Sequence, residues 1–332
     1  MSRFGPLPDP ADLLDHDEAA AAFAAILDST ANDEAITQFL IALAERGETM
    51  VEIAAAAQAM RDRMIPIEAP AGAIDVCGTG GDGHHTLNVS TAVAIVVAAC
   101  EVPVAKHGNR AASSKSGAAD TLEALGLDME RAAQMAEAQL ADLGICFLFA
   151  AHHHPAMKRI MPIRKAIGRR TIFNLMGPLA NPARVTRQLV GIARPAYVPV
   201  YAEALHRLGT EHSRVISGDE GLDELSLAGG NEVAVVLPEG VRMQRRVAAD
   251  AGLPTRSLAE IRGGDATYNA KALRRLLEGE PGAYRDAVLY NAAEALVVAG
   301  AAETLREGVE EAAEAIDKGL ANALLNCWIA YK

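Results

Sequence analysis

The chain has 332 residues, of which half are hydrophobic, and its 43 acidic and 31 basic side chains give a formal net charge of −12. That length exceeds what one hydrophobic core usually serves, so we expect two structural units. The acidic balance argues against a general nucleic-acid binder, which needs a basic surface to displace phosphate counterions.

The cysteines, the N-terminus and the apolar runs indicate the cellular compartment. The four cysteines lie far apart in apolar surroundings, which indicates reduced and largely buried thiols. The N-terminus lacks the apolar stretch of a signal peptide, and the longest apolar run, residues 92–100, is too short to span a bilayer. We therefore expect a cytoplasmic protein with no membrane partner.

The first part of the chain has a helical pattern. Over residues 17–64 apolar side chains recur at spacings of three and four. Thr49 and Glu52 have the spacing of a capping box, and Gly47 stands where the preceding helix should end. No strand pattern occurs here, and two prolines follow as a linker. We predict a small all-helical domain over residues 1–68.

After this domain the pattern changes. Short runs rich in valine and isoleucine alternate with helical stretches, and the last helical stretch covers residues 268–331. This alternation predicts an α/β domain over residues 69–332 with a mainly parallel central sheet. The expected strands are residues 73–77, 102–107, 145–150, 189–193, 214–218 and 232–237. Ligands of such sheets bind beyond the carboxyl ends of the strands, so the loops there are the candidate site.

The loop after the first strand reads GTGGDG, residues 78–83, and has the glycine spacing of a dinucleotide-binding turn. Two observations argue against NAD. The next helix begins only near Ser90, and the next strand ends in Lys106 and His107 instead of an acid that would bind a ribose. An isolated motif of this kind is more often a simple turn. Its glycines nevertheless suit the approach of backbone N–H groups to a phosphate.

The loop after the second strand, residues 106–117, combines three cations with serine and asparagine side chains and leads into a helix. Cations, hydroxyl groups and a helix N-terminus together suit a phosphate. We also expect ordinary N-caps from Ser90 and Ser116. Two adjacent loops of this kind predict a highly phosphorylated ligand.

Two further loops follow strands. Residues 152–183 begin with three consecutive histidines, which as neighbours do not readily converge on one metal ion, and continue with a basic run. We interpret that run as a solvated helix face, from which one arginine can turn inward to bind a carboxylate. The last loop has four acids between Asp219 and Glu224. Opposite two phosphate loops, Asp223 and Glu224 suit Mg²⁺.

Six segments together resemble the anthranilate phosphoribosyltransferase family: DVCGTGGDG, NVST, KHGNRAASSKSGAADTLEALG, HHPAMK, RTIFNLMGPLANPA and GLDELS. They occur in the family's order and at its spacings, and the resemblance covers nearly the whole chain. It implies a fold of the nucleoside phosphorylase/phosphoribosyltransferase type. The implied reaction transfers the phosphoribosyl group of 5-phosphoribosyl 1-pyrophosphate (PRPP) to anthranilate, in tryptophan biosynthesis.

The resemblance also implies a cofactor and an assembly. The cofactor is Mg²⁺, with two ions expected beside PRPP. The assembly is a homodimer formed through the helical domain, and residues 155–185 pack back toward that domain. At Ala118 the family often has a serine, and Leu87 and Val89 replace the commoner Phe and Ile. No motif position is lost outright, so the resemblance implies an active enzyme.

Individual roles follow from the same resemblance. Lys106 and Arg164 are implied as catalytic residues. The positions implied for PRPP are Gly78, Gly80, Gly81, Asp82, Thr86, Asn88, Ser90, Thr91, Lys106, Gly108, Ser114 and Lys115. Those implied for anthranilate are Gly78, His107, Asn109, His154, Arg164 and Gly177. Those implied for the metal are Ser90, Asp223 and Glu224.

Two alternatives stay open. A pyrimidine nucleoside phosphorylase would share the GTGGD loop, but the KHGNR and GPLANP segments argue against it. A catalytically silent homologue that binds nucleic acid should have a basic surface and should lack the Mg²⁺ acids. Here the net charge is −12, and both Asp223 and Glu224 are present.

Overall fold

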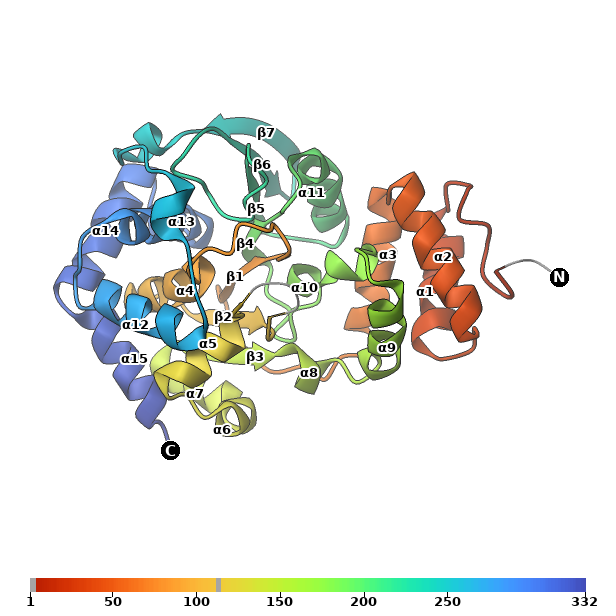
Figure 1. The fold of residues 1–332 in the computed structure, drawn as a ribbon, viewed down its shortest axis with the longest axis horizontal. Helices are drawn as coiled ribbons and strands as arrows, with labels where there is room; N and C mark the ends of the chain where they lie inside the picture. The colour runs from red at the N-terminus through yellow and green to blue at the C-terminus, as the bar shows by residue number, and fades with distance from the viewer. Residues whose placement is uncertain (1–3, 112–114) are drawn as a thin grey trace.

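Three helices form the N-terminal end of the molecule in the computed structural model, which describes residues 4–111 and 115–332. They lie together at one end of the long axis (Figure 1) and are α1 (His16–Leu27), α2 (Asp33–Arg46) and α3 (Met50–Arg61). Each begins after a residue whose side chain accepts a hydrogen bond from the first turn, namely Asp15, Asn32 and Thr49. The expected all-helical start of the chain is confirmed.

The predicted capping box of α3 also builds a buried ionic contact. Thr49 N–H donates to Glu52 Oε2 at 2.8 Å, and Glu52 N–H donates to Thr49 Oγ1 at 3.2 Å. The same carboxylate is fully buried, pairs with Arg46 at the end of α2 and accepts from Leu14 N–H at 3.3 Å. Gly47 ends α2 with a φ of 94°. Glu52 therefore holds the start of α3, the end of α2 and the segment before α1 together.

A seven-stranded sheet lies at the centre of the larger part of the molecule, in the order β3-β2-β1-β4-β5-β6-β7. Its strands are β1 (Ile74–Gly78), β2 (Val104–Gly108), β3 (Ile145–Phe149), β4 (Arg187–Gly191), β5 (His212–Gly218), β6 (Asn231–Leu237) and β7 (Gly240–Arg246). Strands β1 to β5 are parallel, whereas β6 and β7 are antiparallel to their neighbours. The expected, mainly parallel sheet is confirmed.

The sequence predicts six of these seven strands. β7 is not predicted, because its sequence, GVRMQRR, is polar and none of its residues is buried. An edge strand of this composition has no apolar face for a pattern to reveal. All six predicted strands form within two residues of their expected limits.

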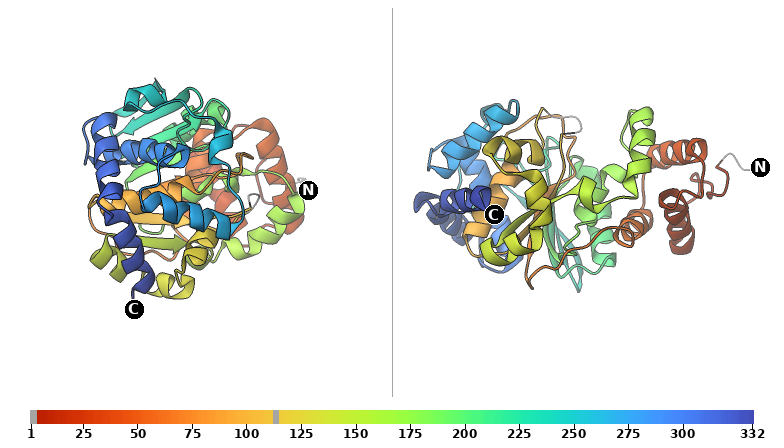
Figure 2. Two further views of the ribbon diagram at one scale, coloured as in Figure 1. Left: turned by 60° about the vertical axis from the view of Figure 1, so that its left-hand side comes forward. Right: turned by 90° about the horizontal axis from the view of Figure 1, so that it is seen from below.

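Helices cover both faces of the sheet (Figure 2). One hydrophobic cluster contains buried residues of α4 (Val89–Ala99), α5 (Ala118–Leu125), α6 (Met129–Gln134), α12 (Ala266–Leu277), α13 (Ala283–Ala299), α14 (Leu305–Asp317) and α15 (Leu320–Ala330). A second contains residues of the three N-terminal helices, α9 (Met157–Ile167), α10 (Met176–Leu179) and α11 (Val198–Arg207). A small third cluster includes α7 (Ala136–Leu143) and lies near the short α8 (Ala150–His153). In β5, Val215 belongs to the second cluster and Ile216 to the first, as strand alternation requires.

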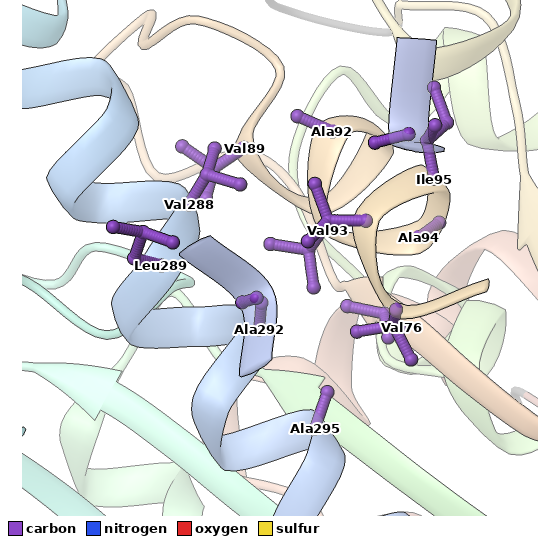
Figure 3. Packing of buried hydrophobic residues seen from close by; sticks show 14 of the residues in the cluster. Val76, Val89, Ala92, Val93, Ala94, Ile95, Val288, Leu289, Ala292 and Ala295 are labelled. Carbon is purple, nitrogen blue, oxygen red and sulfur yellow. The ribbon is translucent and has the colours of Figure 1, made fainter. Parts of the chain in front are cut away.

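Helix α4 contains nearly all of the longest apolar run of the sequence, and its buried apolar residues belong to the first cluster. It packs against α13, where alanine and valine side chains of the two helices face each other (Figure 3). A helix that is apolar all round must be covered on every side, and nine of its side chains are buried. No helix within the described ranges combines the length and the apolar character needed to cross a membrane.

The second cluster joins the N-terminal helices to the sheet. The ring of Phe23 lies edge-on to the rings of Phe39 and Phe173, at centroid distances of 6.3 and 6.4 Å. Phe173 belongs to the segment that precedes α10, and the cluster continues through it to β4 and β5. The helices and the sheet therefore share one continuous apolar core.

The basic run of residues 158–170 is not simply a solvated face. Arg159 Nη2 lies 2.7 Å from Asp33 Oδ1, and Arg169 Nη2 lies 2.8 Å from Glu45 Oε1. Both acids belong to α2, which α9 contacts directly. These two arginines attach α9 and the segment after it to the N-terminal helices.

Three local predictions are wrong. α4 begins after Asn88 and α5 begins after Gly117, so neither Ser90 nor Ser116 is an N-cap. At the start of α4, Ser90 N–H donates to Glu224 of the acidic loop, and at the start of α5, Gly117 N–H donates to Asp120 in the first turn of the same helix. Cys327 is exposed, since it lies on the outer side of α15.

Removal of the Glu52 carboxylate should strongly destabilise the protein. Glu52→Ala leaves Arg46 without its partner and breaks the capping box, so we expect the free energy of unfolding to fall by about 3–5 kcal/mol. Glu18→Ala is the matched control, because Glu18 completes the capping box of α1 at an exposed position and should cost about 1 kcal/mol or less. Urea unfolding followed by circular dichroism measures both. Equal losses in the two variants would contradict this role.

Candidate active site

The carboxyl ends of β1 and β4 are glycines, and this lets an acidic loop lie over the edge of the sheet. A Cβ on Gly78 would come within 2.3 Å of Asp223 Oδ2, and a Cβ on Gly191 within 1.6 Å of the Asp223 carbonyl oxygen. Neither position has room for a side chain. The loop between β5 and β6, which carries Asp223 and Glu224, is therefore seated directly on the ends of two central strands.

The glycine loop, residues 78–83, contacts this acidic loop. Gly80 N–H donates to Asp223 Oδ2 at 2.7 Å. Gly80, Gly81 and Gly83 have φ angles of 69°, 75° and 78°, in the left-handed region that glycine adopts without strain. The motif thus requires its glycines for conformation. One of the amides expected to face a phosphate is here bound to a carboxylate.

The first turn of α4 lies beside the second acid. Ser90 N–H donates to Glu224 Oε1 at 3.0 Å, so the carboxylate occupies the helix N-terminus, where the helix dipole favours negative charge. Thr91 in the same turn is buried, and its hydroxyl has no hydrogen-bond partner among the described residues. The structure therefore brings together Ser90, Asp223 and Glu224, the three residues predicted for a metal.

The acids at this edge carry unfavourable charge. Burial raises the pKa values of Asp223 and Glu224 above their usual range, and the negative charges of Asp82 and Asp223, respectively, raise them further. Buried Lys106 partly opposes this effect on Glu224, while its Nζ donates to Val76 O at 2.7 Å. Two adjacent carboxyl groups of this kind, one half-buried and one buried, favour a cation, because positive charge relieves both their repulsion and their desolvation.

A pair of neutral histidines lies where β2 ends. His107 Nδ1 is 2.7 Å from Gly177 O, and the ring centroids of His107 and His154 are 5.2 Å apart. Burial is the main cause that lowers the pKa of His107 to about 3 and that of His154 to about 4. Both Nε2 atoms are buried and have no hydrogen-bond partner within the described ranges. Two buried polar ring atoms at this end of β2 therefore lack a hydrogen-bond partner among the described residues.

The three consecutive histidines diverge. His152 is exposed, with its ring edge-on to that of Phe149 at 5.1 Å. His153 Nδ1 lies 2.9 Å from the carbonyl oxygen of Ile65, in the linker after α3. His154 faces His107. Only the last of the three belongs to the candidate site.

Two buried residues that sequence reasoning missed organise the site from beneath. Asp75 is fully buried in β1 and accepts from His107 N–H at 3.1 Å and from Asn181 Nδ2 at 2.8 Å. Asn181 Nδ2 also donates to Ala105 O at 2.8 Å, which fixes the GPLANP turn against β1 and β2. The available signal was a carboxylate inside the apolar run AIDVC, where an unpaired charge would be costly.

Asn88, which is predicted to contact PRPP, also makes structural contacts. Its Oδ1 accepts from Thr121 Oγ1 at 2.5 Å and from Asn269 Nδ2 at 2.8 Å. These donors belong to α5 and α12, so Asn88 connects the start of α4 to two other helices. Its side-chain carbonyl oxygen is fully used in these contacts.

The remaining residues predicted for the site make fewer contacts with the rest of it. Gly108 lies against a phenylalanine of β3, because a Cβ there would come within 2.7 Å of the ring. Thr86 forms an isolated β-bridge with the segment before α12. Asn109 and Lys115 are exposed. Ser114 lies outside the described residues.

Arg164 stands apart from the other candidates. Its guanidinium is half-buried on α9, where Nη1 lies 3.6 Å from Met161 Sδ, and burial lowers its pKa. No carboxylate of the described residues pairs with it, whereas Arg159 and Arg169 on either side are paired. The structure does not bring Arg164 into contact with the strand ends.

Comparisons with known proteins match the chain from end to end. Two family models fit it: "Glycosyl transferase family, helical bundle domain" over residues 12–64 and "Glycosyl transferase family, a/b domain" over residues 71–322. The anthranilate phosphoribosyltransferase of Sphingopyxis alaskensis is 88% identical over 332 residues, which is 100% of both chains.

Solved structures agree with this. The crystal structure of anthranilate phosphoribosyltransferase from Thermus thermophilus is 40% identical with a TM-score of 0.90, over 99% of each chain. The enzyme of the same name from Saccharomyces cerevisiae, in complex with PRPP and Mg, is 28% identical with a TM-score of 0.89. That match covers 99% of this chain and 96% of the yeast chain.

Acid should destabilise the protein through the two buried histidines. The pKa values of His107 and His154 in the folded state, about 3 and about 4, lie below the ~6.5 of an exposed histidine, so the unfolded state binds more protons in between. Their contribution to stability is therefore complete above about pH 6.5 and falls as the pH falls toward 4. Wild type should lose more stability than His107→Gln between pH 7 and pH 5, by about 2 kcal/mol.

Urea unfolding at the two pH values measures this difference. His152→Gln is the control, because that side chain is exposed, and it should behave as wild type. The same pH dependence in His107→Gln and in wild type would show that the buried pair does not contribute.

Proposed function

The chain belongs to the anthranilate phosphoribosyltransferase family, and on this basis we propose that it transfers the 5-phosphoribosyl group of PRPP to anthranilate. The products are N-(5-phosphoribosyl)anthranilate and pyrophosphate, and the step belongs to tryptophan biosynthesis. The observation that carries the proposal is the seating of Asp223 and Glu224 against the glycine loop and the first turn of α4. A diphosphate with Mg²⁺ requires this combination of acids, glycines and a helix N-terminus.

The residues present fit Mg²⁺. Asp223 and Glu224 supply the hard oxygen ligands that this ion takes, and Ser90 stands beside them with a hydroxyl. Within the described ranges no three His, Cys, Asp or Glu side chains are grouped so as to hold a metal alone. Phosphate oxygens and water complete the coordination in our proposal, which includes two ions. Bound there, Mg²⁺ neutralises the charge that develops on the leaving pyrophosphate.

Side chains of the protein at the carboxyl end of the sheet also act on the charge of the leaving pyrophosphate. Breaking the bond between the anomeric carbon and the diphosphate oxygen leaves positive charge on the ribose and negative charge on the pyrophosphate. Lys106 is buried beside the acids, and among the described residues its ammonium group, which has three protons to donate, donates one hydrogen bond, to Val76 O. We assign Lys106 to the phosphates of PRPP, where a fixed cation stabilises the departing charge.

Anthranilate, the acceptor of the phosphoribosyl group, needs to be oriented more than it needs to be activated by a base. The amine of anthranilate is neutral at neutral pH, so no strong general base is required. Arg164 is a half-buried cation without an acidic partner among the described residues, and its planar fork suits the anthranilate carboxylate. We assign His107, His154, Asn109 and Gly177 to the same substrate. The unbonded Nε2 atoms of the two histidines support this assignment. The acceleration expected from these groups is an orientation effect.

We also propose that the protein works in the cytoplasm as a homodimer formed through its N-terminal helices. A groove of about 380 Å³ lies along α1 and α3, and its lining includes Ala20, Ala24, Ala54 and Ala55. Small side chains let a second helix approach closely. A mass of one chain in light scattering would contradict the dimer.

Loss of anthranilate fluorescence tests the reaction directly. Purified protein mixed with PRPP, Mg²⁺ and anthranilate should abolish the fluorescence, and EDTA in place of Mg²⁺ should prevent this. Incubation with thymidine and phosphate tests for nucleoside phosphorylase activity, and we expect no product. Folded protein that leaves the fluorescence unchanged would overturn the proposed function.

Arg164→Ala should weaken apparent affinity for anthranilate about tenfold or more, because a charge-assisted hydrogen bond typically contributes about 1.5–3 kcal/mol. The KM for PRPP should stay as in wild type. Lys165→Ala, at the exposed neighbouring cation, should change neither constant. A raised KM for PRPP with an unchanged KM for anthranilate would show that Arg164 serves the other substrate.

A further inference from the structure

Arg170 connects the glycine loop to the segment that follows α9. Its Nη1 donates to Gly81 O at 3.2 Å, and a Cβ built on Gly81 would lie 3.3 Å from the same nitrogen. The guanidinium therefore covers Gly81 over both its carbonyl oxygen and its α-carbon. Arg169, the preceding residue, pairs with Glu45 of α2, whereas no carboxylate of the described residues pairs with Arg170. Two adjacent arginines thus serve two different parts of the molecule.

The glycine loop has few other supports. A Cβ built on Gly80 or on Gly83 would meet no heavy atom within 4 Å, and both residues are exposed. Gly80 N–H is held by Asp223, and His84 Nε2 lies 3.0 Å from Glu220 O. Both of these contacts come from the acidic loop between β5 and β6. The hydrogen bond from Arg170 comes from a different element, on the side of the N-terminal helices.

Fixing the conformation of such a glycine-rich loop costs conformational entropy. Glycine loses more backbone freedom than any other residue when it is fixed, and three glycines with positive φ follow one another within four positions. A loop that is already ordered before the ligand arrives does not incur this cost on binding. A donor that holds Gly81 in place therefore acts on ligand affinity without touching the ligand.

The surroundings of Arg170 link the loop to the helical end of the molecule. Arg170 lines a cavity of about 480 Å³ together with Glu48, Arg194 and Tyr197. Tyr197 O–H donates to Glu48 Oε2 at 2.6 Å, and Glu48 lies just beyond the end of α2. Arg194 lies over the Tyr197 ring, 5.8 Å from its centroid. Arg170 therefore stands between the glycine loop and a wall that the N-terminal helices help to form.

We propose that Arg170 is a positioning residue for PRPP, which holds Gly81 so that the glycine loop is ordered before the diphosphate binds. This inference rests on the proposed function of that loop. It assigns to Arg170 an effect on PRPP binding rather than on the chemical step. It also separates Arg170 from Arg169, whose side chain donates hydrogen bonds to Ile41 O and Glu45 of α2.

The experiment compares Arg170→Gln with Arg169→Gln and with Arg170→Lys. In protein without ligand, amide hydrogen exchange of residues 78–84 should be several-fold faster in Arg170→Gln than in wild type. In the fluorescence assay its KM for PRPP should rise about tenfold, with kcat within twofold of wild type and the KM for anthranilate unchanged. Arg170→Lys retains one donor and should recover most of the loss.

The control separates this role from a general loosening of the fold. Arg169→Gln removes a cation of the same segment and should alter neither the exchange of residues 78–84 nor the KM for PRPP. Wild-type exchange and wild-type KM in Arg170→Gln would overturn the inference, and so would equal changes in both glutamine variants. If wild type itself neither binds PRPP in calorimetry nor consumes anthranilate, the proposed function fails, whereas the exchange data still test the contact.

Discussion

The candidate site depends on one steric constraint, the absence of side chains at the ends of two neighbouring parallel strands. Because Gly78 and Gly191 have no Cβ, the backbone and the carboxylate of Asp223 can lie where side chains would otherwise point. That close approach also places Glu224 at the first turn of α4. The glycine loop, the acidic loop and the helix start meet at one point because β1 and β4 are adjacent in the sheet. A methyl group at either position would separate them.

A second property of the site is buried charge that is only partly compensated. Asp75 is the best satisfied of the acids, with donors from a backbone amide and from Asn181, and burial still raises its pKa to about 6. Asp223 accepts from Gly80 N–H and Glu224 from Ser90 N–H, the charge of Asp223 raises the pKa of Glu224, and buried Lys106 opposes that effect. Such an arrangement lowers the stability of the free protein and raises its affinity for a cation. Buried charges that destabilise the free protein are expected at ligand-binding sites, because the bound ligand compensates them.

The sequence predicts the architecture well because the signals are local. The valine-rich strand runs, the Thr49–Glu52 capping box and Gly47 at the end of α2 can each be read within a few residues. What it does not predict depends on contacts between distant segments. The bond from Arg170 to Gly81 joins positions 89 residues apart, and the pairing of Arg159 and Arg169 with α2 spans still more of the chain.

Side chains of the candidate site show the same limit. Motif position indicates which residues lie near the strand ends, but not what each one bonds. The motif predicts that Asn88 contacts the ligand, but it does not reveal that its side-chain carbonyl oxygen accepts hydrogen bonds from two helices. Asp75 and Asn181 sit in quoted motifs without a predicted role, because burial beneath the site is not visible in the spacing of residues.

The attachment of α9 to α2 has a consequence for the geometry of catalysis. Arg164 is carried by a segment whose ionic contacts go to the N-terminal helices, whereas Lys106, Asp223 and Glu224 are carried by the sheet. Phe23, Phe39 and Phe173 belong to the apolar cluster that joins α9 and the N-terminal helices to the sheet, so we expect the distance between the two proposed substrate anchors to depend on how these rings pack. Substitutions among these three side chains could therefore change the distance between the proposed anthranilate anchor and the proposed PRPP anchors while every motif of the site stays the same.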